Sequence, residues 1–492
     1  MPTRSYNRFT PWVEQDDYLT NWPGFVEHKN MDGIKDGYAL HLWPKVNKAI
    51  ITTNAISSIE FRFQAASENL EDSIIWWENG EIYRLNSTDS TPLYTLAGNE
   101  YIISIALLGN DYYIFYKQTV STVSVWVAKV NANDVENGSF STMNETFKSP
   151  WDFSCVWCMP IKKLGNYLYF CNSWWSVARM DSLGTVDPYW FPDDYTVGIT
   201  IQGTTVVVYT RSGNVYLWDG SSLTASAQKY IWFRISKVTS KGWLDYLTSD
   251  DGQLYVWTGF SFERITKPKI SNRMNNSSSY DKRLSFNIDE TNQLQNRSMT
   301  VWLDDVYLYS SDTIKGIYKY GKLQDGMRSG LHKIVTQNHL WTQIDYVYDF
   351  YFYERNLKRM YFSYKAGATY WVDYIDLDSM ETATDGYAIT EVFSWNSASF
   401  VKKINQVIRS TSNTSWSNYI DIHYRINNGA WELIRRINDA TDTIKSSEIT
   451  KQDGSTWFRN NNDVQFKFTF HNDDGWVDSP ALHEVIYEYN LI

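Results

Sequence analysis

The chain has 492 residues, a formal net charge of −11 and a mean hydropathy of −0.44. The acidic balance argues against a surface that holds nucleic acid by neutralising phosphates, although like-charged walls would let DNA slide through a channel. Three cysteines exclude a disulfide framework, and the longest apolar run has only the length of a strand, too short to span a membrane.

Residues 1–68 are predicted to form an irregular N-terminal arm. Prolines and glycines interrupt this segment, and the first residues lead into no apolar run, so we expect no signal peptide. The low cysteine count in turn favours synthesis in a reducing cytosol. Exposed aromatic side chains on an arm need a surface to pack against, either the chain's own core or a neighbour's. The candidates for such contacts are Trp12, Trp22, Phe25 and Trp43.

Residues 69–385 are predicted to form a β-propeller. A glycine followed by aromatic and aliphatic residues recurs along this region, and residues 213–220 and 252–259 are nearly the same phrase. Residues 206–209 are apolar on both faces, as expected where sheets pack face to face. The spacing of roughly 45 residues predicts about seven blades, with five or six left open. The predicted centres are Trp77, Tyr113, Tyr169, Val208, Tyr255, Leu308 and Tyr361.

Residues 267–299 break this rhythm with a polar run rich in asparagine and serine. A connection of that length inside a domain is usually either disordered or functional, so a floppy surface loop and a partner-contacting loop are both open. If the loop contacts a partner, its candidate residues are Arg273, Tyr280, Arg283 and Arg297.

Residues 386–492 are predicted to form an antiparallel β-sandwich. Residues 464–470 alternate strictly between apolar and polar side chains, which is typical of a sheet with one buried face. The Asn427-Asn428-Gly429 sequence predicts a hairpin turn between two such strands.

The chain carries no recognisable catalytic or cofactor-binding motif, so we expect neither enzymatic activity nor a cofactor or metal. Cys155, Cys158 and Cys171 lack a fourth ligand nearby and are interpreted as small buried residues. Tryptophan pairs at 76–77 and 174–175 favour core packing over sugar stacking. Paired aspartates fit β-turns better than a glycosidase site. These pairs lie at 16–17, 193–194, 250–251, 304–305 and 473–474.

Two regions carry a resemblance to a known group of proteins. Residues 386–395 (GYAITEVFSW), 422–426 and 478–482 resemble the β-sandwich that follows a propeller in many tailed-phage virion proteins. Residues 30–40 resemble the opening of podovirus tail-nozzle and neck proteins. The resemblance implies a propeller that takes part in surrounding a DNA channel, and it assigns no catalytic residue.

We therefore expect a structural component of a phage tail or neck, made in the host cytoplasm and located in the virion. Its expected partners are other copies of itself in a cyclic ring, portal, adaptor or other tail proteins, and viral DNA that passes without sequence-specific binding or membrane insertion. The alternatives are a receptor- or carbohydrate-binding tail protein and, less favoured, a propeller glycosidase.

Overall fold

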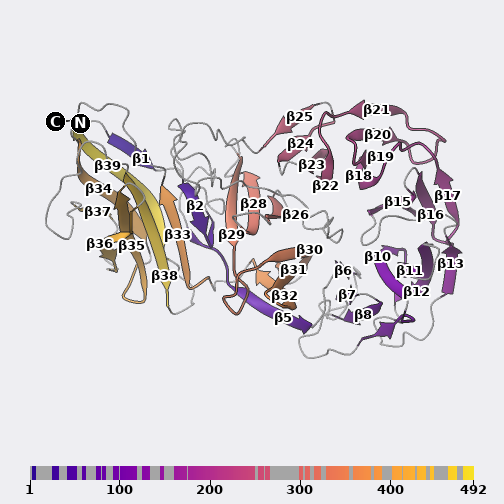
Figure 1. Ribbon diagram of the computed structural model, residues 1–492, viewed down its shortest axis with the longest axis horizontal. Coiled ribbons are helices and arrows are strands. Elements are labelled where there is room, and N and C mark those ends of the chain that lie inside the picture. The colour runs from indigo at the N-terminus through magenta and orange to yellow at the C-terminus, as the bar shows by residue number, and fades with distance from the viewer. Residues whose placement is uncertain are drawn as a thin grey trace.

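The computed structural model shows an all-β protein in which a ring of sheets is followed by a two-layered sandwich (Figure 1). None of the described segments forms a helix of membrane-spanning length and apolarity. The described residues are 3–6, 25–32, 41–52, 58–61, 74–78, 80–84, 92–98, 100–118, 125–132, 134, 144–148, 160–173, 176–249, 253–259, 261–265, 299–302, 305–310, 315–322, 329–353, 358–377, 382–390, 402–412, 414–426, 429–438, 444–447, 464–473 and 480–491.

Seven four-stranded antiparallel sheets form the blades of the ring, here numbered one to seven in chain order. Blade one contains β6 (Ser58–Phe61), β7 (Ile74–Glu78), β8 (Glu81–Arg84) and β9 (Tyr94–Thr95). Blade two contains β10 (Glu100–Leu108), β11 (Asp111–Gln118), β12 (Val125–Asn131) and β13 (Asn144–Lys148). Blade three contains β14 (Ile161–Leu164), β15 (Tyr167–Ser173), β16 (Ser176–Asp181) and β17 (Val186–Tyr189). Blade four contains β18 (Thr196–Gln202), β19 (Thr205–Thr210), β20 (Asn214–Trp218) and β21 (Ala227–Tyr230).

The remaining blades complete the circle. Blade five contains β22 (Ile235–Lys241), β23 (Leu244–Ser249), β24 (Leu254–Trp257) and β25 (Phe262–Arg264). Blade six contains β26 (Met299–Trp302), β27 (Asp305–Ser310), β28 (Gly316–Lys322) and β29 (Ser329–Val335). Blade seven contains β30 (Tyr346–Tyr353), β31 (Arg359–Ala366), β32 (Thr369–Asp376) and the N-terminal strand β5 (Val46–Thr52). The first strand of each blade contacts the first strand of the next, and β30 contacts β6, which closes the propeller.

The predicted propeller and its sevenfold count are confirmed, because the seven predicted centres fall in seven different sheets. The core explains why strands are apolar on both faces. In β19, Val206 and Val208 pack toward blade three, whereas Val207 and Tyr209 pack toward blade five. Each such side chain is fully buried, so a central strand has no face for water.

The sandwich lies beside the ring, and both chain ends lie at its far side (Figure 1). One of its sheets has the order β2 (Phe25–Lys29), β33 (Asp385–Thr390), β38 (Val464–Asn472), β35 (Asn418–Ile426) and β36 (Glu432–Ile437). The other has the order β1 (Thr3–Tyr6), β39 (Ala481–Leu491), β34 (Lys402–Ser412) and β37 (Ile444–Ser447). A separate small sheet pairs β3 (Met31–Asp32) with β4 (His41–Leu42).

The structure distributes the segment 1–68 among other units instead of leaving it as an arm. Its strands β1 and β2 belong to the sandwich, β5 is the outer strand of blade seven, and β6 begins blade one. The physical reason is edge pairing, because an unpaired outer strand would expose a row of backbone hydrogen-bonding groups. The N-terminal segment therefore ties the two domains together. The polar loop predicted at 267–299 lies almost wholly outside the described residues, since β26 begins at Met299.

Candidate functional site

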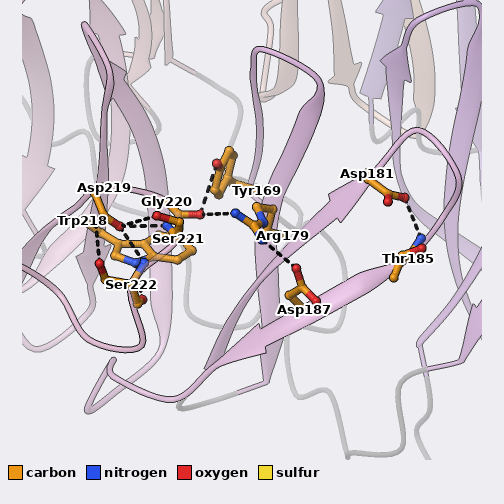
Figure 2. Close-up of polar contacts among 10 residues, drawn as sticks. All are labelled: Tyr169, Arg179, Asp181, Thr185, Asp187, Trp218, Asp219, Gly220, Ser221 and Ser222. Atoms are coloured by element: carbon orange, nitrogen blue, oxygen red, sulfur yellow. Dashed lines mark hydrogen bonds and ion pairs between the residues drawn. The ribbon is translucent and has the colours of Figure 1, made fainter.

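A group of polar contacts joins blade three to blade four (Figure 2). The Arg179 guanidinium donates from Nη1 to the Gly220 carbonyl at 3.1 Å and from Nη2 to Asp187 Oδ2 at 2.7 Å. The Tyr169 hydroxyl donates to the same Gly220 carbonyl at 3.3 Å. One backbone oxygen of blade four is thus held by two side chains of blade three.

The Gly220 carbonyl is positioned by a tight turn that begins at Asp219. Asp219 Oδ1 accepts hydrogen bonds from the backbone nitrogens of Ser221 at 2.8 Å and Ser222 at 2.7 Å. The Ser222 hydroxyl and these backbone donors stabilise the charged carboxylate and lower the pKa of Asp219 to about 2. Gly220 has a φ of +81°, and a Cβ there would lie 2.5 Å from the Tyr169 hydroxyl, so glycine is required at this contact.

The same contact recurs between blades two and three. The Tyr113 hydroxyl and Lys129 Nζ donate to the Ser182 carbonyl at 2.7 Å and 3.1 Å. Tyr113 and Lys129 are direct cross-strand partners, as are Tyr169 and Arg179. We call each tyrosine–cation pair with its acceptor carbonyl a latch.

A partial version of the latch joins blades four and five. Lys229 Nζ donates to the Gly259 carbonyl at 2.7 Å and lies 5.5 Å from the ring centroid of Trp257. Gly259 follows Trp257 as Gly220 follows Trp218, so the repeated phrase in the sequence marks equivalent acceptor turns. The repeat therefore encodes a carbonyl position as well as a strand.

Electrostatics keep the latch groups in their donor forms. Burial raises the pKa of the Tyr169 hydroxyl, which therefore remains protonated at neutral pH. For Arg179, burial lowers the pKa, but the Asp187 carboxylate and neighbouring tyrosines outweigh that effect and the net shift is upward. Because the phenol and the guanidinium both remain donors, the hydrogen bonds to the Gly220 carbonyl persist at neutral pH. The latch is therefore suited to holding adjacent blades together.

The Arg179→Ala variant is expected to lose about 2 kcal/mol of unfolding free energy, because it removes a charge-assisted hydrogen bond to a partly buried carbonyl and an ion pair with Asp187, whose side chain is half exposed. Urea denaturation followed by tryptophan fluorescence measures this loss. Arg179→Lys is the matched control, since Lys129 fills the equivalent position in blade two and a lysine should restore part of the stability. An alanine variant as stable as the parent would contradict the latch.

A buried carboxylate occupies the joint between blades four and five. Asp245 is fully buried, and its Oδ2 accepts hydrogen bonds from Thr200 Oγ1 at 2.9 Å and Gln202 Nε2 at 2.7 Å, and also from the Tyr209 hydroxyl. Burial raises the pKa of Asp245 to about 6, although these donors pull it the other way. This carboxylate is the acceptor on which three side chains of blade four converge.

The paired aspartates that the structure describes are engaged locally. Asp193 Oδ2 accepts a hydrogen bond from Asn214 Nδ2 at 2.5 Å, and Asp194 Oδ2 accepts one from the Ser212 backbone nitrogen at 2.8 Å. Asp305 Oδ2 lies 3.2 Å from Lys319 Nζ in blade six. Asp473 follows β38 of the sandwich. The Asp193–Asp194 pair, Asp305 and Asp473 therefore lie in three different parts of the fold, and the other members of the predicted pairs lie outside the described residues.

Of the predicted contact residues, only Trp43 has a described side chain. Trp43 is 3% exposed and packs in the core between blades six and seven, with Lys319 Nζ 5.3 Å from its ring centroid. It therefore packs against the chain's own core instead of a neighbour. Phe25 begins β2 and pairs with Thr390 through the backbone. The candidates outside the described residues are Trp12, Trp22, Arg273, Tyr280, Arg283 and Arg297.

The interpretation of the cysteines can be examined at one position. Cys171 is a free, buried residue in the core between blades two and three, whereas Cys155 and Cys158 lie outside the described residues. Within the part of the chain that the structure describes, no three histidine, cysteine, aspartate or glutamate side chains gather into a metal-binding group.

The latches and the Asp245 joint were not predicted from the sequence. One sequence signal could have indicated the latches. In blades two and three, the turn between the first and second strands contains Gly-Asn, and a tyrosine lies four residues after the glycine. Those tyrosines are Tyr113 and Tyr169, the two hydroxyl donors of the complete latches.

No protein-family model and no curated protein matches the chain. Among solved structures, it is similar to the computationally designed Ika8 protein, with 10% identity, a TM-score of 0.39 and coverage of 68% of this chain and 99% of that one. It is similar to a chain of the mitotic checkpoint complex, with 10% identity, a TM-score of 0.38 and coverage of 76% and 91%. It is also similar to a chain in the structure of BBS1N in complex with ARL6DN, with 9% identity, a TM-score of 0.42 and coverage of 68% and 98%.

Proposed function

We propose that this protein is a structural component of a bacteriophage tail or neck that assembles as a ring with copies of itself around the DNA channel. Portal, adaptor or other tail proteins would be its neighbours, and the virion its location. The sequence resemblance of the sandwich and of residues 30–40 suggests the setting. The latched propeller supplies a rigid block, which suits a subunit that bears load from its neighbours.

The observation that carries this proposal is an apolar end of the propeller. In a four-stranded antiparallel blade, the turns between the first and second strands and between the third and fourth strands lie at the same end. We call this the A–B end. In blades three to five, large apolar side chains on these turns are exposed to solvent. Exposed apolar side chains that gather at one end are typical of a protein–protein interface. The exposed side chains on these turns are Tyr167, Leu183, Leu223, Trp243 and Leu244, with exposed fractions of 37%, 81%, 82%, 69% and 37%.

Light scattering tests the proposal. The purified protein is expected to have a mass that is a ring-sized multiple of 57.6 kDa, or to be captured by virion particles. The double variant Leu223→Asp, Trp243→Asp places two charges on the A–B end and should reduce the assembly to subunits. Trp416→Asp changes an 86% exposed tryptophan of the sandwich and serves as the control. A parent protein that stays monomeric and is captured by no virion particle would refute the proposal.

A further inference from the structure

The opposite end of the propeller carries a repeated tryptophan–phenylalanine pair. The connection from blade three to blade four contains Trp190-Phe191, and the connection from blade four to blade five contains Trp232-Phe233. We call this end, where one blade passes to the next, the D–A end. Neither pair belongs to the repeated glycine–aromatic phrase or to the tryptophan pairs considered in the sequence analysis.

The phenylalanines of the two pairs occupy equivalent positions. Phe191 lies 5.5 Å from the ring centroid of Tyr216 in β20, and Phe233 stacks on Tyr255 in β24 at 4.1 Å. Tyr216 and Tyr255 hold the same place in the third strand of their blades, three residues after the glycine that begins the repeated sequence phrase. The two connections therefore each place a phenylalanine against the equivalent tyrosine of the next blade, tilted at Tyr216 and stacked at Tyr255.

The tryptophans beside these anchors face outward. The exposed fractions of Trp190 and Trp232 are 53% and 75%. Tyr230 of β21, which precedes Trp232 by two residues, is 69% exposed. Edge-on contact with Phe233 at 5.5 Å holds the Trp232 ring in place. Because Phe233 is itself packed, the indole is presented to solvent in a defined orientation, at little further cost in side-chain entropy on binding.

Polar groups of blade four lie next to this aromatic surface. Asn214, the cross-strand partner of Tyr230, donates from Nδ2 to Asp193 Oδ2 at 2.5 Å. Gln228 Nε2 donates to Asn214 Oδ1 at 3.1 Å and to the Tyr216 hydroxyl at 3.2 Å. Burial raises the pKa of Tyr216, so its hydroxyl stays protonated at neutral pH. A connected set of amide, carboxylate and hydroxyl groups thus borders the exposed rings.

We propose that the D–A end of blades three to five, formed by Trp190, Tyr230, Trp232, Asp193, Asn214 and Gln228, binds a neutral oligosaccharide. A sugar ring offers polarised C–H bonds to the negative face of an indole, and its hydroxyl groups suit amide and carboxylate partners. Two arginines at this end offset the charge of Asp193 and Asp194, which favours an uncharged ligand. Arg211 lies in the turn between β19 and β20, and Arg234 lies in the connection from blade four to blade five. One tryptophan per blade matches a polymer with repeating rings better than a single globular partner. This binding goes beyond the structural role, because it needs no assembly and uses the other end of the propeller.

The test uses the full-length chain and an array of neutral hexose and N-acetylhexosamine oligosaccharides, followed by calorimetry with the best binder. Trp190→Ala and Trp232→Ala are each expected to weaken binding about tenfold, the upper range for loss of one aromatic contact. Trp416→Ala, which removes a tryptophan of the sandwich that is more exposed than either, should leave affinity unchanged. Circular dichroism of each variant confirms that the fold is retained.

Two results would overturn the proposal. One is that no neutral oligosaccharide on the array binds at millimolar concentration. The other is that the Trp190→Ala, Trp232→Ala double variant binds as tightly as the parent. Light scattering of the same samples separates this outcome from failure of the structural role, because a protein that assembles but binds no sugar would refute only the binding site.

Discussion

Replacing Gly213 with alanine is expected to lower the free energy of unfolding by about 3 kcal/mol, from the cost of a left-handed backbone together with a steric clash. Gly213 has a φ of +97°, and a Cβ there would lie 2.4 Å from the Ile231 carbonyl oxygen and 2.6 Å from that of Phe233. Both atoms are backbone atoms of the connection between blades four and five, so neither can rotate away. Urea denaturation measures the loss.

The control for this variant is Gly242→Ala in the first turn of blade five. Gly242 also has a positive φ, of +58°, but no atom lies within 4 Å of a Cβ built there. Only the backbone penalty remains, about 1 kcal/mol. Equal losses for the two variants would show that the close approach at Gly213 has no energetic weight.

The Asp245→Leu variant is expected to lose about 3 kcal/mol, because it leaves the Tyr209 hydroxyl, the Thr200 hydroxyl and the Gln202 amide without their shared acceptor inside the protein. Leucine matches the volume of the aspartate only roughly, so a second variant is required. Asp245→Asn keeps the shape and an acceptor oxygen while it removes the titration. It should therefore fold at least as stably as the parent near neutral pH.

The titration of Asp245 makes the free energy of unfolding depend on pH. The folded-state pKa of Asp245 is raised to about 6, above its ordinary value near 4, so the folded protein binds this proton more tightly than the unfolded chain does. The stability contributed by Asp245 is therefore greatest below about pH 4 and falls as the pH rises toward 6. Between pH 4.5 and pH 7.5, the parent should lose on the order of 2 kcal/mol relative to Asp245→Asn. Parallel pH profiles for the two proteins would contradict the assignment.

The propeller could be predicted from the sequence because its information is local. The phrase that starts at Gly213 contains the turn glycine, the alternating Val215 and Leu217, and the aromatic Trp218 within eight residues. The glycine is needed where the chain turns between the second and third strands, and the aromatic side chains fill the joints between blades. Blades one, six and seven carry a glycine at the same turn, whereas in blades two and three the phrase begins at a glycine between the first and second strands. A turn glycine followed by aromatic residues is therefore visible without knowledge of the contacts.

The role of the N-terminal segment could not be predicted in the same way. β5 pairs with β32, which lies more than 300 residues later in the chain. No pattern in residues 46–52 indicates which strand they pair with. The same holds for Trp43, whose burial depends on blades six and seven. The core packing predicted for the 76–77 pair is confirmed at Trp77, which is fully buried. The sequence did not single out Trp190 and Trp232, which are exposed beside partly buried phenylalanines.

The pairing of β1 with β39 joins Thr3 to Glu488, so β1 cannot pair until synthesis has passed residue 488. At the usual rates of synthesis, roughly 5 to 20 residues per second, β5 emerges some tens of seconds before its partner β32. During that interval, blades one to six can form in order, while the N-terminal strands remain unpaired and open to association with other chains. We expect premature termination before residue 369 to yield an open, aggregation-prone propeller, so that closure by β5 acts as a check that translation has reached the seventh blade.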